Sequence, residues 1–266
     1  MEKVLYLLGD AILDNFYWLS HPEHDLTYEL TQLGYQVYNC AADGIRVGNI
    51  FSGQVVAPHY RNKRKYPYPV DQEGRLRPFH QLAKATHGHS AFQSTYQDSF
   101  STMLNKSKEE IAVLSLGGLD LDSNSVNIAF GKDYFMNTLL TKEFVTGYEK
   151  AITTCLAACR KVILVSVYLP YLGTGAKYSS LAGWAKPIID GWNEFVRSQG
   201  QKHNIPVVEL SRTFNPYQRE HYGSEETKAS NLSSKALARC LDHIARHYHG
   251  YRVYYAPECG KVKHDY

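Results

Sequence analysis

Short apolar runs that do not alternate with polar residues recur along the chain, and they constrain the fold more than any other feature. We predict five of them as strands, at residues 4–8, 36–40, 111–116, 162–167 and 206–210. Such runs are typical of strands buried on both faces of a parallel sheet. Amphipathic segments between them predict helices at residues 24–33, 142–158, 184–198 and 233–247, with Gly34 and Gly200 as stop signals. This alternation predicts an α/β protein, an open three-layer α/β/α sandwich around a mostly parallel five-stranded sheet.

The chain of 266 residues fits one large domain better than two small ones, since a single core accommodates up to about 250–300 residues. One region breaks the alternation, because residues 53–108 contain no convincing strand and hold four prolines among many polar residues. A long irregular excursion of this kind is usually a functional loop or insertion. We therefore predict a single domain over residues 1–266, an irregular insertion at about 53–108, and a loosely packed end after Gly250.

The composition excludes several classes of protein. Hydrophobic residues make up 44% and charged residues 21%, which is ordinary for a globular domain and rules out general disorder. A net charge of +3 does not by itself indicate a nucleic-acid partner. The basic segment at residues 59–66 lies in the insertion. Its charges are as consistent with a solvated loop as with a surface that binds phosphate or nucleic acid. No apolar run approaches the roughly 18 residues of a membrane span, so we expect none, while a protein partner stays open.

The cysteines and histidines favour neither a zinc site nor another metal centre. Five cysteines without zinc spacing predict reduced, buried thiols: Cys40, Cys155, Cys159, Cys240 and Cys259. Asp10 and Asp14 flank a turn with no histidine near them in sequence, and His87 and His89 lie in the insertion. We expect no metal and no cofactor. The first apolar stretch is too short for a signal peptide, so we expect a cytoplasmic or otherwise reducing location.

Small and acidic residues follow three of the predicted strands, and a histidine precedes the last predicted helix. The segments are residues 9–15 (GDAILDN), 41–44 (AADG), 117–120 (GGLD) and 218–221 (QREH). Ligands bind at the carboxyl ends of strands in open α/β sheets, so these segments form the candidate site. In this order, over nearly the whole chain, they resemble the four sequence blocks of the SGNH, or GDSL-type, hydrolases. The resemblance implies a flavodoxin-like SGNH fold and serine-dependent hydrolysis of a small ester.

In that family, the first block places a nucleophilic serine at a strand-to-helix turn, and the second and third supply donors to the oxyanion. The last block supplies a histidine base, oriented by an aspartate three residues earlier. By resemblance, the catalytic positions here are Asp10, Ala11, Gln218 and His221, and the oxyanion or binding positions are Gly44, Gly117, Leu119 and Asp120.

Three of these positions depart from the family pattern. Ala11 stands where the nucleophilic serine is expected, and alanine has no oxygen with which to attack an ester. Leu119 replaces an asparagine donor, a loss that typically costs about 10²–10³ in rate. Gln218 replaces the aspartate and does not stabilise an imidazolium as an anion does.

Two main functions therefore stay open, besides a weaker third, a nucleic-acid or phospholipid-surface binder that uses the basic loop. The chain is either an ester hydrolase in which Ala11 has replaced the serine, deliberately or by natural loss, or a non-catalytic binding module. The second would use the same crevice for a small ligand or a protein partner.

Overall fold

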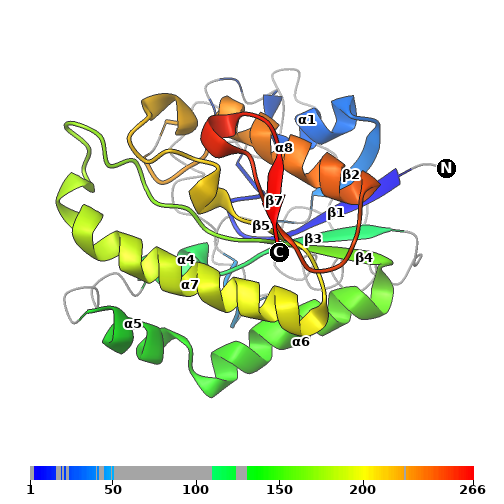
Figure 1. Ribbon diagram of the computed structural model, residues 1–266, viewed down its shortest axis with the longest axis horizontal. Coiled ribbons are helices and arrows are strands. Elements are labelled where there is room, and N and C mark those ends of the chain that lie inside the picture. Colours follow the sequence, from blue (N-terminus) through cyan, green and yellow to red (C-terminus); the bar gives the residue numbers. More distant parts are fainter. Residues whose placement is uncertain are drawn as a thin grey trace, which may run out of the picture.

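The computed structural model describes residues 3–15, 24–39, 110–123, 131–224 and 226–266, together with residues 19, 21, 41, 45–48 and 50 (Figure 1). The strands are β1 (Lys3–Gly9), β2 (Tyr35–Asn39), β3 (Ile111–Ser115), β4 (Lys161–Val165), β5 (Val207–Val208), β6 (Val253–Tyr255) and β7 (Lys263–Asp265). The α-helices are α1 (Leu26–Gln32), α4 (Gly118–Ser123), α5 (Lys132–Leu139), α6 (Lys142–Ala158), α7 (Ala182–His203) and α8 (Asn231–Arg246). The insertion predicted at 53–108, with its basic segment and its two histidines, lies outside the described residues, as do Cys40 and Gly44.

A seven-stranded sheet forms the centre of the molecule, with its strands in the order β2-β1-β3-β4-β5-β6-β7. Neighbouring strands from β2 to β6 pair in parallel, and β7 pairs antiparallel to β6. The prediction of a mostly parallel α/β sheet is confirmed, but the prediction of five strands is wrong. The end after Gly250, which we expected to be loosely packed, supplies β6 and β7. Pattern reading missed them because each has three residues, and those of β7 are all exposed.

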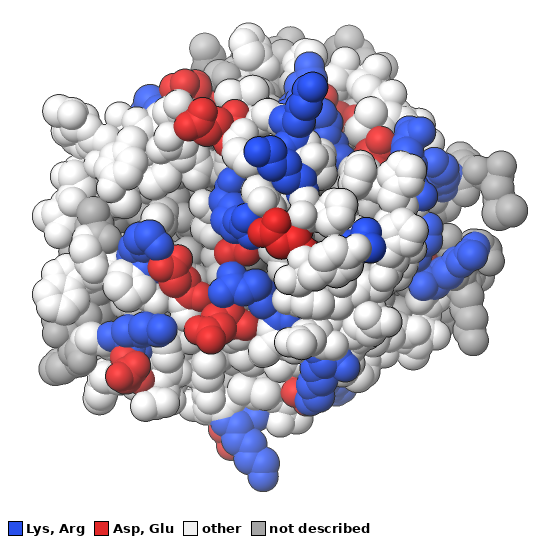
Figure 2. Space-filling view, in the orientation of Figure 1, with Lys and Arg blue, Asp and Glu red and all other residues white. Residues whose placement is uncertain are grey.

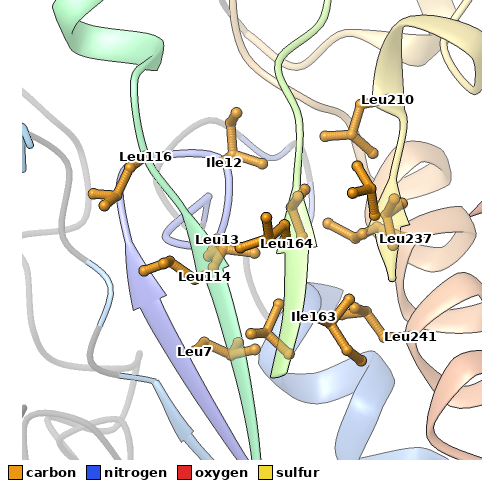
Figure 3. Close-up of a cluster of buried hydrophobic side chains, with 14 of the residues drawn as sticks. Leu7, Ile12, Leu13, Leu114, Leu116, Ile163, Leu164, Leu210, Leu237 and Leu241 are labelled. Carbon is orange, nitrogen blue, oxygen red and sulfur yellow. The ribbon is translucent and has the colours of Figure 1, made fainter. Parts of the chain in front are cut away.

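Three neighbouring strands, β1, β3 and β4, carry much of the core. In β3, every residue is buried, and the last five of β1 and the last four of β4 are buried as well. Figure 3 shows Leu7, Leu114 and Ile163 from these strands, together with Leu237 and Leu241 from α8, in one cluster of apolar side chains. Burial on both faces explains why the strands read as continuous apolar runs.

Helices cover both faces of the sheet, which makes the three layers that the sequence predicts. In Figure 1, α1 and α8 lie against each other on one side of the strands, and α5, α6 and α7 lie on the other. None of the helices in the described ranges is long and apolar enough to cross a bilayer. Four of the five cysteines are described, and all four are buried free thiols, as predicted: Cys155, Cys159, Cys240 and Cys259.

Two of the long helices, α6 and α8, begin at side-chain caps that can be found in the sequence. The Thr141 hydroxyl accepts a hydrogen bond from Phe144 N and starts α6, and Ser230 caps α8 in the same way by accepting from Ser233 N. The stop predicted at Gly200 is wrong, because α7 continues to His203. This glycine serves close packing instead: a Cβ there would lie 2.5 Å from the side chain of Val207.

Candidate functional site

The turn after β1 is tied to the turn after β3 by the buried carboxylate of Asp10. Its Oδ1 accepts hydrogen bonds from Ile12 N and from the Ser115 hydroxyl, each at 3.1 Å, and its Oδ2 accepts from Gly118 N at 3.0 Å. The Asp10 N–H also donates to the Ser115 carbonyl at 3.0 Å. Asp10 therefore acts on the shape of the site, holding two strand ends in register.

The electrostatics of Asp10 reflect this buried position. Burial raises its pKa to about 6, while its three donors and the positive charge of Lys228 act in the opposite direction. Lys228 lies between the last block and α8 in sequence. Its effect on the pKa of Asp10 indicates that this segment lies near the first turn.

Two glycines allow these turns to approach closely. Gly9 has φ +126°, and a Cβ there would lie 1.7 Å from the Ser115 carbonyl oxygen. Gly117 has φ +109°, and a Cβ there would lie 2.0 Å from the ring of Trp192. The glycine that the resemblance placed among the binding residues, Gly117, thus has a steric role in the described structure.

Ala11 lies in the first turn, directly after Asp10. The turn is closed by hydrogen bonds from Leu13 N and Asp14 N to the Asp10 carbonyl, while Ile12 N is taken by the Asp10 carboxylate. The Ala11 side chain is half-buried, and among the described residues its N–H has no hydrogen-bond partner. This backbone donor, at the carboxyl end of β1, can meet an acceptor atom of a ligand.

Asp120 of the third block contacts the chain just after the second block. Its Oδ2 accepts a hydrogen bond from Val47 N at 3.2 Å, and burial raises its pKa to about 6, against the lowering effect of Arg46. The expected oxyanion donor of the second block, Gly44, lies outside the described residues, three positions before Val47. Leu119 is half-buried, and its apolar side chain offers no donor.

His221 is buried, with 1% of its surface exposed, and its ring is held by the backbone. The Asn215 N–H donates to His221 Nδ1 at 2.7 Å. A neutral imidazole has one donor and one acceptor nitrogen, so an accepting Nδ1 leaves the proton on Nε2. Burial lowers the pKa of His221, which favours this neutral form. The side chain of Gln218, half-buried at the start of the His221 turn, makes no hydrogen bond to the ring within the described structure.

The first turn of α8 connects the two halves of the site. The Asn15 side-chain amide donates to the Ser234 hydroxyl at 2.6 Å, and the Ser233 hydroxyl donates to the His221 carbonyl at 2.7 Å. The strand-one turn and the histidine segment are therefore anchored on adjacent residues of one helix.

Sequence reasoning missed three of the residues that build these contacts, namely Asn215, Ser233 and Ser234. The Asn-Pro pair at 215–216 is a turn signal, and the serines lie beside a helix cap, but neither pattern names a partner. Within the described residues, no group of three or more His, Cys, Asp or Glu side chains converges to hold a metal ion.

Comparison with known proteins shows the fold. No protein-family model and no curated protein sequence matches the chain significantly. Among solved structures, the M. smegmatis aryl esterase matches with a TM-score of 0.54 at 13% identity, covering 92% of this chain and 99% of that one. A catalytic mutant of Axe2, an acetylxylan esterase from Geobacillus stearothermophilus, matches with a TM-score of 0.51 at 14% identity, covering 98% of this chain and 97% of that one.

The chain therefore has the fold of the SGNH-type hydrolases, as its four sequence blocks predicted. The matches extend over nearly the full length of both chains, so the likeness concerns the whole α/β/α architecture and not one motif. At this level of identity it concerns the fold alone, and the chemistry has to be argued from the side chains.

Proposed function

We propose that this protein is a non-hydrolytic binding protein that uses the ester-binding crevice of an esterase fold to hold an acyl ester or a related carbonyl compound. The observation that carries the proposal is the hydrogen bond from Asn215 N–H to His221 Nδ1. With that nitrogen occupied as an acceptor, Nε2 carries the ring proton. A general base needs a free lone pair at the nitrogen that faces the nucleophile, and His221 in this tautomer offers a donor instead.

The other departures from the family pattern also argue against hydrolysis. Ala11 has no oxygen to form an acyl-enzyme, and Leu119 gives no hydrogen bond to an oxyanion. Gln218 leaves the imidazole without an anionic partner, and Asn215 has taken the ring nitrogen that an aspartate would have oriented. Nucleophile, base, base orientation and oxyanion donor are all altered, whereas a knockout of catalysis needs one change.

The groups that remain are suited to binding. The Ala11 N–H, which has no partner among the described residues, supports recognition of a carbonyl oxygen, since it is a backbone donor at a fixed turn. The fold neighbours are described as aryl and acetylxylan esterases, and this makes acylated aromatic or carbohydrate compounds the first ligands to test. The proposal places the carbonyl of such a compound against the Ala11 N–H.

The activity test restores the nucleophile stepwise. We expect the wild type and Ala11→Ser to hydrolyse p-nitrophenyl acetate at the uncatalysed rate, because in the proposed arrangement the introduced serine meets a ring nitrogen that carries a proton. Adding Gln218→Asp and Leu119→Asn supplies an orienting carboxylate and an oxyanion donor, and any rate gained by this triple variant should disappear with His221→Ala. Hydrolysis by Ala11→Ser alone, well above background and dependent on His221, would overturn the proposal in favour of an esterase that lacks one atom.

The binding test uses phenyl acetate, which the wild type should not consume. Isothermal titration calorimetry should detect binding to the wild type and a loss of at least tenfold in affinity for Ala11→Phe, whose ring would fill the space at the half-exposed turn. Leu156→Phe on the outer, exposed side of α6 is the matched control and should bind like the wild type. Equal binding to the wild type and Ala11→Phe would place the ligand elsewhere and contradict the proposal.

A further inference from the structure

A hollow lies between the C-terminal half of α8 and the segment that leads into β7. Its volume is about 660 Å³, within the range of roughly 300–1,000 Å³ that small-molecule sites occupy. The Ser233 hydroxyl contacts the His221 segment at one end of α8, whereas Arg239, His243 and Arg246 line this hollow towards the other end. With a rise of 1.5 Å per residue, Ser233 and Arg246 lie about 20 Å apart along the helix axis. The hollow adjoins the His221 segment at Cys259, whose Sγ lies 3.8 Å from the Ser233 Oγ, and its basic end at Arg246 points away from that segment along α8.

Positive charge predominates in its lining. Arg239, Arg246 and Lys261 face a single acid, Asp242, and His243 and His247 add ring N–H donors. Figure 2 shows Lys and Arg side chains gathered on this face of the molecule, over α8 and the C-terminal strands, with a few acidic side chains among them. The balance of formal charge in the lining favours an anion with two negative charges over a neutral ligand.

The cations differ in how far they are already engaged. Arg246 Nε donates to Asp242 Oδ1 at 2.7 Å, and the Arg239 guanidinium donates to the Cys259 and Gly260 carbonyls. Lys261 is exposed and makes no hydrogen bond or ion pair within the described structure. Its ammonium group is available to a ligand without breaking an existing contact.

The negative end of the α8 dipole does not by itself account for the three cations that line the hollow. A helix end carries about half a negative charge, worth roughly 0.3–1 kcal/mol with a nearby cation, and Arg246 in the last turn already meets it. Lys261 comes from another segment and brings a further charge to the same space. The partial charge of the helix end opposes an anion, but three formal cations outweigh it.

The wall opposite α8 is held in a defined shape. Glu258 and Cys259 have φ of 51° and 55°, a backbone region that non-glycine residues rarely adopt. The Arg239 guanidinium and a 3.2 Å hydrogen bond from Cys259 N to the Thr213 carbonyl secure this turn. A preformed wall lowers the conformational entropy that a ligand must offset on binding.

From the volume, the charge and the fixed wall, we propose that this hollow binds the phosphate group of a small phosphate monoester, with Lys261 and Arg246 as its main charged contacts. A phosphate monoester carries about −1.5 to −2 charge at pH 7, which matches the excess positive charge of the lining. The volume leaves room for an organic body beside the phosphate group. This site is independent of the function proposed for the crevice.

The test compares two probes of similar shape and different charge. Phenyl phosphate is largely a dianion at pH 7.5, whereas phenyl sulfate is a monoanion. Calorimetric titration of the full chain at low salt should show phenyl phosphate binding at least tenfold more tightly than phenyl sulfate. Lys261→Gln should weaken phenyl phosphate binding about tenfold, as expected for loss of a charged hydrogen bond, and Lys261→Glu should weaken it further.

Lys235→Gln is the matched control, because Lys235 is exposed on the same helix but does not line the hollow. It removes one positive charge and should leave affinity within twofold of the wild type. Equal losses for Lys261→Gln and Lys235→Gln, equal binding of the two probes, or no binding of phenyl phosphate would each overturn the proposal. Binding to anionic phospholipid vesicles but not to phenyl phosphate would assign the charges to a lipid surface and overturn it as well.

Discussion

At the scale of single residues, short contacts made by the backbone decide what the neighbouring side chains can do. The Asn215 N–H sets the tautomer of His221, and the Ser115 carbonyl and Trp192 ring leave no space for a Cβ at Gly9 and Gly117. Without these neighbours, the imidazole of His221 could adopt either neutral tautomer, and a residue with a Cβ would meet no clash at either glycine position. The neighbouring groups therefore fix the tautomer at His221 and the residue type at Gly9 and Gly117.

Gly117→Ala should destabilise the fold strongly, because it combines a positive φ with a clash. A Cβ 2.0 Å from Trp192 forces the buried ring to move, and overpacking of this kind typically costs about 1–3 kcal/mol in addition to about 1–2 kcal/mol of backbone strain. Gly175→Ala provides the control, since its φ is +77° but no atom lies within 4 Å of the added Cβ. Denaturant unfolding followed by tryptophan fluorescence should show the larger loss for Gly117→Ala. Similar losses of stability in Gly117→Ala and Gly175→Ala would mean that the clash with Trp192 does not destabilise the fold.

At the scale of elements, the C-terminal strand is held by contacts other than apolar burial. The Arg212 guanidinium pairs with the Asp265 carboxylate at 2.7 Å and stacks 3.5 Å from the ring centre of Tyr255. Arg252 lies 4.6 Å from the ring centre of Tyr266. This exposed ion pair and the two cation–π contacts, together with three residues paired along β6, attach β7 to the sheet edge.

Deletion of residues 263–266 should therefore act locally. We expect a stability loss of only about 1–2 kcal/mol, because β7 buries no side chain, but a clear loss of hydrogen-exchange protection in β6. Hydrogen exchange followed by mass spectrometry would compare β6 with α6, which should keep its protection. Global unfolding of the truncated chain would contradict a merely peripheral role for β7.

At the scale of the whole molecule, buried acids and histidines make opposite contributions to the pH dependence of stability. Burial raises the pKa of Asp10 and Asp120 to about 6, above the 3.8 of an ordinary aspartate. The folded protein keeps these protons where the unfolded chain has released them, so this contribution falls as pH rises from about 4 to above 6. Burial lowers the pKa of His221 and His243, and their contribution is lost as pH falls through about 6.5.

Asp10→Asn isolates one of these contributions. The variant should be less stable than the wild type at pH 4.5, by about 1–3 kcal/mol, because an amide cannot accept all three hydrogen bonds. The gap should narrow by about 2 kcal/mol by pH 7.5, since the wild type must then bury a charged carboxylate. Chemical denaturation across this pH range measures the difference, with exposed Asp133→Asn as the control that keeps the pH dependence of the wild type. A gap that widens with pH would show that Asp10 is stabilised as an anion.

The sequence alone determined the fold class, and it predicts the position of the candidate site. Continuous apolar runs predict strands buried on both faces, and the residues that follow such strands must meet at one edge of a parallel sheet. The helix at 142–158 agrees with the structure at both ends, because its cap and its periodicity are local signals. The four blocks, including the alanine in the nucleophile position, can also be identified from the sequence.

Only the tertiary structure decided what these residues can do. Neither the pairing of β7 nor the bond from Asn215 to His221 leaves a periodic signal, because each depends on groups brought together by the chain path. The same holds for the hollow beside α8, whose cations come from segments with no shared motif. Burial patterns repeat along a sequence, and so they can be read from it. The direction of a single hydrogen bond on a ring nitrogen is set by the local packing of the folded chain, and here that direction leaves the ring proton of His221 on Nε2.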